Sequence, residues 1–429
     1  MIRSIRRRAS YANVVATVAL FAAIATAAAV LAAAPAAHAT VRFADPNGSL
    51  SGTCAPPDPP CTLERATNNV AVTGDEVIVA PGDYPVTNQL NIASGVEVHG
   101  AAGQPRPRVA SSAPLVGVNV SGALRAIEIE LTGSGGYALN LNDGATAEEL
   151  LVQSANSATC NFFLGGINAT ALLRDTVCWN TVTGAFACAV CLNQGGSGTR
   201  AATLRNVTAV ATGLSSGVVA GASGDGVNTI EGQNVIASAP STDVGADATS
   251  PAVAEVTLEY SNYETRNASG TGASITDPTT ANNQTAAPLF TNSTTGDFHQ
   301  LAGSPTIDAG SASASMLGTL DFDGEPRIAG PAPDIGADEF VDTSPPDTTI
   351  TKRPKNKTRK RRARFEFTST EPGSTFECKL DTKPYRPCSS PKRYARLKPG
   401  RHIFRVRAKD AADNVDATPA TDSWRVKKN

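Results

Sequence analysis

The sequence predicts an all-β protein in which a parallel β-helix is followed by a small β-sandwich. Along most of the chain, short runs of alternating apolar and polar residues end at Gly, Pro or Asn, as strands do before tight turns. Similar runs recur every 24 to 31 residues, a drifting period that suits the coils of a solenoid. Aromatic residues make up only 5% of the chain, which has 37 glycines, so layers of small side chains fit better than an aromatic core.

The N-terminal residues have the organisation of a secretory signal peptide, predicted at residues 1–39. Four arginines precede an apolar run from about Val14 to Ala34, and Ala37-His38-Ala39 places small residues where a signal peptidase cleaves. We expect cleavage after Ala39 and a secreted, extracellular or cell-surface protein. The apolar run is also long enough to span a bilayer, so an uncleaved anchor is the alternative.

Charge divides the remaining chain near Asp342. Residues 41–341 contain 10 Arg, no Lys and 29 acidic residues, whereas residues 342–429 contain 23 basic and 10 acidic residues. The net charge of −2 therefore conceals an acidic main body and a basic C-terminal domain.

The eight cysteines of an exported chain predict disulfides. Cys54 with Cys61 and Cys378 with Cys388 are isolated local pairs. The middle four allow three pairings; if Cys160 and Cys188 occupy equivalent places in adjacent coils they can bond, leaving Cys178 with Cys191. The alternative is a zinc site, since Cys188-Ala-Val-Cys191 has the spacing of metal ligands.

The start of the solenoid is predicted to carry a cap. After a strand at residues 40–44 and a Pro-rich loop, Thr62 can cap a short helix that covers the open end of the stacked strands. The segment Cys61-Thr-Leu-Glu-Arg-Ala66 resembles the N-terminal Cys-Ser-Leu-Arg-Glu-Ala module of secreted β-helix proteins, with the order of Arg and Glu exchanged.

The predicted coils repeat one strand. It can be aligned on Arg125, Glu149, Arg174, Arg205 and Gln233, with further strands between these positions at residues 137–141, 160–164, 188–192 and 216–220. Asparagines in the coils are expected to satisfy turn backbone rather than bind a ligand: Asn140, Asn161, Asn206 and Asn234.

The first coils resemble a known fold family. Gly74 to Tyr84, with its Pro-Gly and Tyr, and the later Gly95-Val-Glu-Val-His-Gly100 resemble the opening coils of pectate-lyase-like right-handed parallel β-helices. The resemblance implies a right-handed β-helix. It implies nothing about activity.

Residues 288–339 resemble the choice-of-anchor Q domain that follows bacterial β-helices. The matching landmarks include Gly296-Asp-Phe-His299, Ser304-Pro-Thr-Ile-Asp-Ala-Gly310, Asp321-Phe-Asp-Gly324 and Asp334-Ile-Gly-Ala-Asp-Glu339. The resemblance implies a surface protein with a C-terminal attachment region.

The basic C-terminal part follows a proline hinge, Ser344-Pro-Pro346. Strands are expected near Thr349 and at residues 363–369, 374–380, 401–408 and 423–426. The segments Gly400 to Ala408 and Asp410 to Asn414 resemble a bacterial Ig-like repeat, which implies a sandwich stapled by Cys378 and Cys388. The expected organisation is thus a signal peptide (1–39), a capped β-helix (40–285), a choice-of-anchor Q-like region (286–341) and a basic Ig-like sandwich (347–429).

No catalytic set stands out in the sequence. His99, His299 and His402 are far apart in the chain, and structural roles are expected for His99 and His299. Four glutamates could line one face of neighbouring coils, where paired carboxylates can act as acid and base, although a solvated face is the simpler interpretation: Glu128, Glu130, Glu148 and Glu149.

Two acidic clusters have a calcium-like pattern. Asp321 and Asp323, with Asp334 and Asp338 nearby, are candidate metal ligands, although the match to a full calcium loop is poor and a turn is the simpler interpretation. A second cluster has the same pattern and the same alternative: Asp410, Asp413, Asn414 and Asp416. No other cofactor is predicted.

The basic run Lys352 to Arg364 suits an anionic wall polymer or lipid headgroup, since export argues against nucleic acid. We expect a monomeric protein without catalysis that binds carbohydrate or an envelope polymer. The alternative is a polysaccharide lyase or glycoside hydrolase that acts on acidic polysaccharide.

Overall fold

The computed structural model describes residues 40–428, except 134–135, 156–157, 183–186, 213–214, 279–281 and 313–319. The predicted signal peptide and its cleavage site lie outside these residues. No helix in the described part of the chain is long and apolar enough to cross a membrane.

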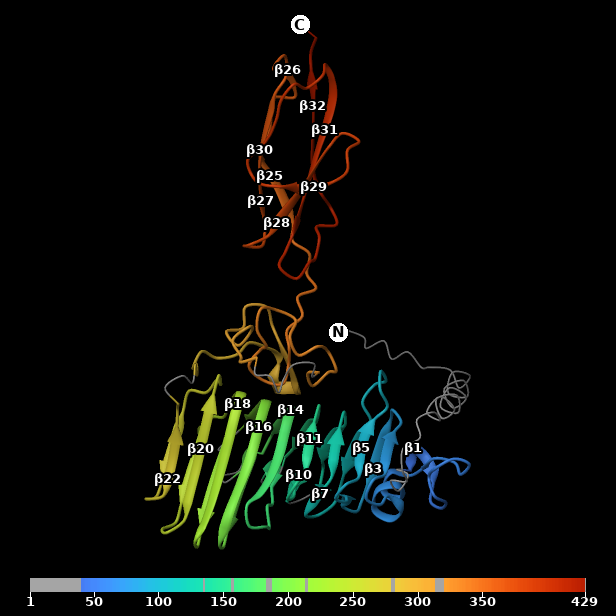
Figure 1. Ribbon diagram of the computed structural model, residues 1–429, viewed down its shortest axis with the longest axis vertical. Coiled ribbons are helices and arrows are strands. Elements are labelled where there is room, and N and C mark those ends of the chain that lie inside the picture. Colours follow the sequence, from blue (N-terminus) through green and yellow to red (C-terminus); the bar gives the residue numbers. More distant parts are fainter. Residues whose placement is uncertain are drawn as a thin grey trace, which may run out of the picture. The chain divides into compact units, whose positions relative to one another are not determined.

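Parallel strands stack along the chain and form a right-handed parallel β-helix, which confirms the predicted fold class (Figure 1). One sheet, called sheet 1, is bent into two arms. Its first arm contains β1 (Val41–Ser49), β2 (Glu76–Val79), β5 (Glu97–Gly100), β8 (Ala123–Arg125), β11 (Thr146–Glu148), β20 (Val253–Glu259) and β22 (Ala273–Thr276). Its second arm contains β3 (Asp83–Val86), β6 (Arg108–Ser111), β9 (Glu128–Leu131) and β12 (Leu151–Ser154).

Three long strands run through both arms: β14 (Ala169–Asn180), β16 (Gly198–Ala211) and β18 (Gly226–Ser238). The other wall, called sheet 2, contains β4 (Leu90–Ile92), β7 (Val116–Val120), β10 (Tyr137–Leu141), β13 (Ala158–Phe162), β15 (Cys188–Gly195), β17 (Ser216–Ser223), β19 (Thr242–Ala248) and β21 (Arg266–Ser269).

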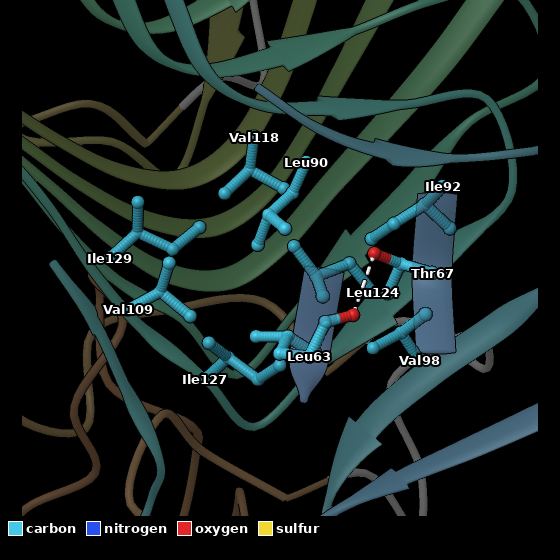
Figure 2. Close-up of a pocket in the computed structure, with 10 residues that line it drawn as sticks. All are labelled: Leu63, Thr67, Leu90, Ile92, Val98, Val109, Val118, Leu124, Ile127 and Ile129. Carbon is cyan, nitrogen blue, oxygen red and sulfur yellow. Dashed lines mark hydrogen bonds between the residues drawn. The ribbon is translucent and has the colours of Figure 1, made fainter. Parts of the chain in front are cut away.

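Alternating burial along the strands places Val, Leu, Ile and Ala in the interior of the β-helix. Figure 2 shows this interior near the N-terminal end, where Leu63, Val98 and Ile129 are among the side chains that surround a void of about 10 Å³. A space of that size is at the lower limit for one water molecule, so it is a packing void and not a ligand site.

A short helix closes the N-terminal end, as predicted. It comprises α2 (Leu63–Arg65) and a wider π-helical turn, η1 (Ala66–Val70). Thr62 caps it, because its hydroxyl accepts a hydrogen bond from the Arg65 amide at 3.3 Å. Leu63 and Ala66 are buried against the first coils, so the helix covers apolar surface that would otherwise be open.

The strand register corrects one predicted equivalence. The sequence alignment of the coils places Glu149 opposite Arg125 and Arg174. In the structure both arginines pair with Glu148 instead. Glu149 follows at the bend between the two arms, where its φ of 55° is in the left-handed region. Glu148 and Glu149 both fit the sequence pattern. Consecutive residues of a strand face opposite sides, so only one of the two can belong to the row of residues aligned with Arg125.

The bend carries a ladder of polar side chains. Asp175, Asn206 and Asn234 have positive φ angles at equivalent places in successive coils. Asn206 Nδ2 donates to Asp175 Oδ1 at 2.7 Å, and Asn234 Nδ2 donates to Asn206 Oδ1 at 2.9 Å. These buried side chains therefore satisfy one another's hydrogen-bonding groups from coil to coil.

A C-terminal extension, residues 286–341, packs on the outside of sheet 1. It contains β23 (Phe290–Asn292), a 3₁₀ turn η2 (Ser293–Thr295) and β24 (Asp297–Gln300). Phe298 and Phe322 of the extension form an apolar cluster with Trp179 and Val210 of the β-helix. The Ala337 amide also donates to Thr208 Oγ1 at 2.9 Å, so the extension and the coils share a core.

All eight cysteines form disulfides, which fits the oxidising conditions outside the cell. The two predicted local pairs, Cys54–Cys61 and Cys378–Cys388, are present. The middle four pair differently from our expectation, as Cys160–Cys178 and Cys188–Cys191.

The strand register explains the different pairing of the middle cysteines. Cys160 of β13 lies opposite Val190, and Cys188 lies opposite Ala158, so these two cysteines are out of register. Cys160 and Cys178 both point into the interior from two walls of the β-helix, with their Cα atoms 6.0 Å apart. Cys188 and Cys191, considered above as zinc ligands, form a disulfide with each other.

The C-terminal strands form separate sheets that fit an Ig-like sandwich. One sheet contains β25 (Thr348–Lys352), β27 (Ala363–Ser369) and β30 (Lys392–Tyr394). The other contains β26 (Lys357–Thr358), β28 (Thr375–Leu380), β29 (Arg386–Cys388), β31 (Gly400–Lys409) and β32 (Ala420–Val426). Phe365, Phe404 and Trp424 form its aromatic core, in contrast to the mainly aliphatic interior of the β-helix.

Candidate functional site

The outer face of sheet 2 carries a row of amide side chains over successive coils: Asn91, Asn119, Asn140 and Asn161. Each of the last three donates from Nδ2 to Oδ1 of the asparagine before it in the row, at distances between 2.7 and 3.2 Å. Asn140 and Asn161 are buried, whereas Asn91 is exposed. The row thus ends in an accessible amide at the N-terminal coils.

Further along the same face is a shallow polar depression of about 220 Å³. Its polar lining comes from four successive coils, through the exposed side chains of Asn193, Ser223, Asp247 and Ser269. Gly221 opens the depression, because a Cβ atom at this residue would lie 2.6 Å from Asn193 Oδ1. We call these residues the polar depression.

An exposed aromatic residue lies on the coil that precedes the polar depression. Phe163 follows β13, and 57% of its surface is exposed. Asn161 pairs with Cys191, so Phe163 and Asn193, each two residues further on, occupy corresponding positions of adjacent coils. An apolar ring beside amide, hydroxyl and carboxylate groups can stack on one face of a ligand and hydrogen-bond to its edges.

The four glutamates do not form the expected row: Glu128 and Glu130 of β9 lie opposite Leu151 and Gln153, whereas Glu148 is in β11 and Glu149 is at the bend. Each of the four lies close to an arginine. Arg108 pairs with Glu130, and its Nε lies 3.4 Å from Glu128. Arg174 lies 2.7 Å from Glu148, and Arg125 lies 4.0 Å from Glu149. These contacts form a lattice of ion pairs rather than a set of unpaired carboxylates.

Arg106 lies where the loop between β5 and β6 meets the C-terminal extension. Its guanidinium carbon is 5.2 Å from the centre of the Phe322 ring, and its Nη2 is 3.6 Å from Asp323 Oδ1. Burial lowers the pKa of Arg106, and the nearby carboxylates oppose this effect. Burial raises the pKa of both Glu128 and Glu149, so this part of the lattice contains the perturbed groups typical of functional sites.

His299, Asp323 and Asp338 come together beside Arg106, with possible ligand atoms within 4.8 Å of one another. The histidine Nδ1 is 2.6 Å from Asp297 Oδ1, and its Nε2 is 2.6 Å from Asp323 Oδ2. The hydrogen bond to Asp323 is the main reason that the pKa of His299 rises to about 10. A protonated imidazole has no lone pair for a metal, so His299 acts here as a cation between carboxylates.

Asp321 and Asp323, the candidate metal ligands, have partners in the protein. Asp321 Oδ1 accepts from the Asp323 amide at 2.9 Å and the Glu325 amide at 2.8 Å, and its Oδ2 accepts from the Glu339 amide at 3.1 Å. These contacts support a structural turn. A cation at this turn stays a prediction.

No family model matches the chain, and no curated protein matches it. Among solved structures, the chain is similar to the crystal structure of pectate lyase Pel9A, with 15% sequence identity and a TM-score of 0.39. The similarity covers 71% of this chain and 97% of the pectate lyase chain. Nothing about the activity of this chain follows from a similarity at that level.

The other histidines have structural contacts. His99 contacts the Gly100 carbonyl and Glu76 Oε1, each at 2.8 Å. His402 of the sandwich lies 2.9 Å from Asp381 Oδ2 and 2.8 Å from the Lys398 carbonyl. Neither has a second histidine or a nucleophile among these partners.

The basic run Lys352 to Arg364 is largely exposed. Arg353 pairs with Asp422 at 3.3 Å, and Arg364 pairs with Glu366 at 2.6 Å. Other members, such as Lys355 and Arg359, are exposed on the connection between β25 and β27 and remain suited to an anionic surface.

Sequence reasoning missed the polar depression. Its residues come from separate coils, and no linear motif joins them. The available signal was the register itself: once the coils are aligned, Asn193, Gly221, Asp247 and Ser269 fall in one column.

Proposed function

We propose that this protein binds a polysaccharide across the coils of sheet 2, without catalysis. The observation that carries the proposal is the polar depression, which presents at least one polar side chain from each of four successive coils. A sugar chain laid across the strands, whose coils are about 4.8 Å apart, would meet Asn193, Asp247 and Ser269 in one column. Ser223 lies two residues further along its strand than Gly221, the member of the column on that coil. Phe163, on the preceding coil, adds an exposed apolar surface.

Affinity electrophoresis of the full chain in gels that contain neutral or acidic polysaccharides tests this proposal. We expect one class to retard the chain, and Asp247→Ala or Asn193→Ala to weaken binding about tenfold, as expected for the loss of a hydrogen bond to a ligand. Gly221→Ala should weaken it as well, because the added methyl group would crowd Asn193.

Glu325→Gln is the matched control, because it removes an exposed carboxylate outside the depression. Equal retardation of the Asp247→Ala variant and this control would place the binding surface elsewhere. Failure of all the polysaccharides to retard the chain would contradict the proposal itself.

A surface location supports the same function. The resemblance of residues 288–339 to choice-of-anchor Q domains and the exposed basic run of the sandwich are consistent with attachment to an anionic envelope polymer. A pull-down on cell wall should therefore be sensitive to salt. Retention that is unchanged after deletion of residues 347–429 would remove the sandwich from this role.

The second candidate is a polysaccharide lyase or hydrolase. The observation that favours it is Arg106, whose pKa is lowered by burial next to Glu128 and Glu149, whose pKa values are raised. Incubation with acidic polysaccharides and Ca²⁺ should release unsaturated or reducing ends if this candidate is correct, and the Arg106→Ala variant should not release them.

A further inference from the structure

Three carboxylates meet where the linker, residues 342–347, reaches the C-terminal sandwich. Asp342 precedes β25, Glu371 lies in the turn between β27 and β28, and Asp410 follows β31. One oxygen of each residue lies within 4.8 Å of one oxygen of each of the others. The fold therefore gathers three negative charges from distant parts of the sequence.

Asp410 is the buried member of this group, with only 8% of its surface exposed. Its Oδ1 accepts a hydrogen bond from the Asn414 amide at 2.8 Å. Its Oδ2 is buried and has no hydrogen-bond partner in the structure. A buried carboxylate oxygen without a partner is costly, since the group has lost water and gained nothing in exchange.

Basic side chains form no ion pair with this group in the described part of the sandwich. Among the ion pairs formed by residues 342–428, none includes Asp342, Glu371 or Asp410. Lys409, the nearest basic residue in sequence, pairs with Asp413 instead.

The cluster of His299, Asp323 and Asp338 differs from this group in its positive charges. That cluster has the same spread of ligand atoms, but it contains the protonated His299, and Arg106 pairs with Asp323. Its positive charges come from the protein. The cluster around Asp410 has the same spacing of ligand atoms but no ion pair with a basic side chain of the described residues.

We propose that Asp342, Glu371 and Asp410 bind a calcium ion. Ca²⁺ takes oxygen ligands at about 2.3–2.6 Å, so two ligands on opposite sides of the ion are about 5 Å apart, which agrees with the spacing of these oxygens. Backbone carbonyls or water would complete the six to eight ligands that the ion requires. Mg²⁺ demands shorter distances and a stricter octahedron, so it fits this open group less well.

The ion would also fasten the linker to the sandwich. Asn414 Nδ2 already donates to the Asp342 carbonyl at 2.7 Å, so the two segments are in contact before any ion binds. Bound calcium adds the Asp342 side chain to the same connection and orders the start of the sandwich.

Isothermal titration of the metal-free full chain with CaCl₂ and with MgCl₂ tests this proposal. We expect a calcium site with a Kd of about 10⁻⁴ to 10⁻³ M, as in other extracellular modules. Glu371→Gln and Asp410→Asn should each weaken calcium binding at least tenfold. Asp413→Asn is the matched control, since it makes the same change in the same loop, on a residue whose side chain is 79% exposed.

Thermal unfolding separates loss of the site from loss of the fold. In a chelator, Glu371→Gln should be at least as stable as the wild type, because it removes a repelling charge. Calcium should raise the Tm of the wild type and leave that of Glu371→Gln unchanged. Hydrogen exchange should slow in residues 342–344 and 410–414 when calcium is added.

Three outcomes would overturn the proposal: no calcium binding at millimolar concentration, equal affinity for magnesium, or binding by Glu371→Gln and Asp410→Asn as tight as by Asp413→Asn. None of these results depends on the polysaccharide proposal, because no sugar is present.

Discussion

Arg327 of the extension lies over Asp175 at the bend of β14, with its Nε 3.9 Å from Asp175 Oδ1. Both residues are almost fully buried. The guanidinium also donates to the carbonyls of Asp334, Ala337 and Gly336, at 2.7, 2.9 and 2.7 Å. One buried arginine thus holds the closing loop of the extension to the first member of the polar ladder.

Arg327→Ala should destabilise the protein by about 3–5 kcal/mol, because removal of one partner leaves the other buried and uncompensated. The measurement is denaturant unfolding followed by the fluorescence of Trp179, which packs against the extension. Arg393→Ala, at an exposed arginine of the sandwich, is the control and should change stability by less than about 0.5 kcal/mol. Similar effects of the two changes would refute the role given to Arg327.

Gly296→Ala should weaken the packing of the extension by more than about 1 kcal/mol. The residue has a φ of 83°, and a Cβ atom would lie 2.5 Å from the Trp179 ring. In a Trp424→Phe background, Trp179 is the sole tryptophan, so its emission reports on the extension. A Gly303→Ala variant has a similar φ of 86° but nothing near its Cβ, so it separates backbone strain from the clash.

Stability should fall as the pH rises from about 5 to 8. Burial raises the pKa of Asp175 to about 7, that of Asp334 to about 6, and those of Asp338 and Glu339 to about 7. At a pH between the unfolded and folded pKa values of these carboxyl groups, the folded protein holds protons that the unfolded chain releases. Their contribution is therefore complete below about pH 4 and is lost as the pH rises through about 7.

Thermal unfolding across this pH range tests the prediction, with an expected loss of several kcal/mol in total, since one unit of pKa shift corresponds to about 1.4 kcal/mol. Asp175→Asn should reduce the slope, because asparagine can still accept the hydrogen bond from Asn206 but does not titrate. A Tm that is constant or rises from pH 5 to 8 would contradict the assigned direction.

The double variant Cys160→Ala/Cys178→Ala should lose about 3 kcal/mol, since that disulfide closes a loop of 18 residues in the unfolded chain. The pair Cys188 and Cys191, three residues apart, should matter less. Peptide mapping without reduction checks the pairing directly. Chymotryptic cleavage after Trp179 should separate Cys178 from a peptide in which Cys188 and Cys191 are joined; a Cys178–Cys191 link would contradict the structure.

The β-helix was predictable because its signals are local. Alternating strands, turn residues and the recurring Arg125, Arg174 and Arg205 fall in register as expected. The error at Glu149 has a simple cause: its neighbour Glu148 has the same side chain, and one step along a strand reverses the face.

The candidate site was beyond prediction for a different reason. The polar depression depends on the register of four coils and on the missing side chain of Gly221. The pairing of Cys160 with Cys178 likewise depends on two walls that bring distant residues into one interior. Loops of unequal length separate these coils, so spacing in the sequence does not report which side chains meet.

The polar ladder at the bend has a consequence for the order of folding. Its last member, Asn234, accepts a hydrogen bond from the Ser311 amide at 2.8 Å and donates one to the Ser311 carbonyl at 3.2 Å. The extension thus uses groups that exist in the right place only after the coils of β14, β16 and β18 have stacked. Its conformation is templated by the solenoid, so a chain made from the N-terminus completes its scaffold before the segment that depends on it appears.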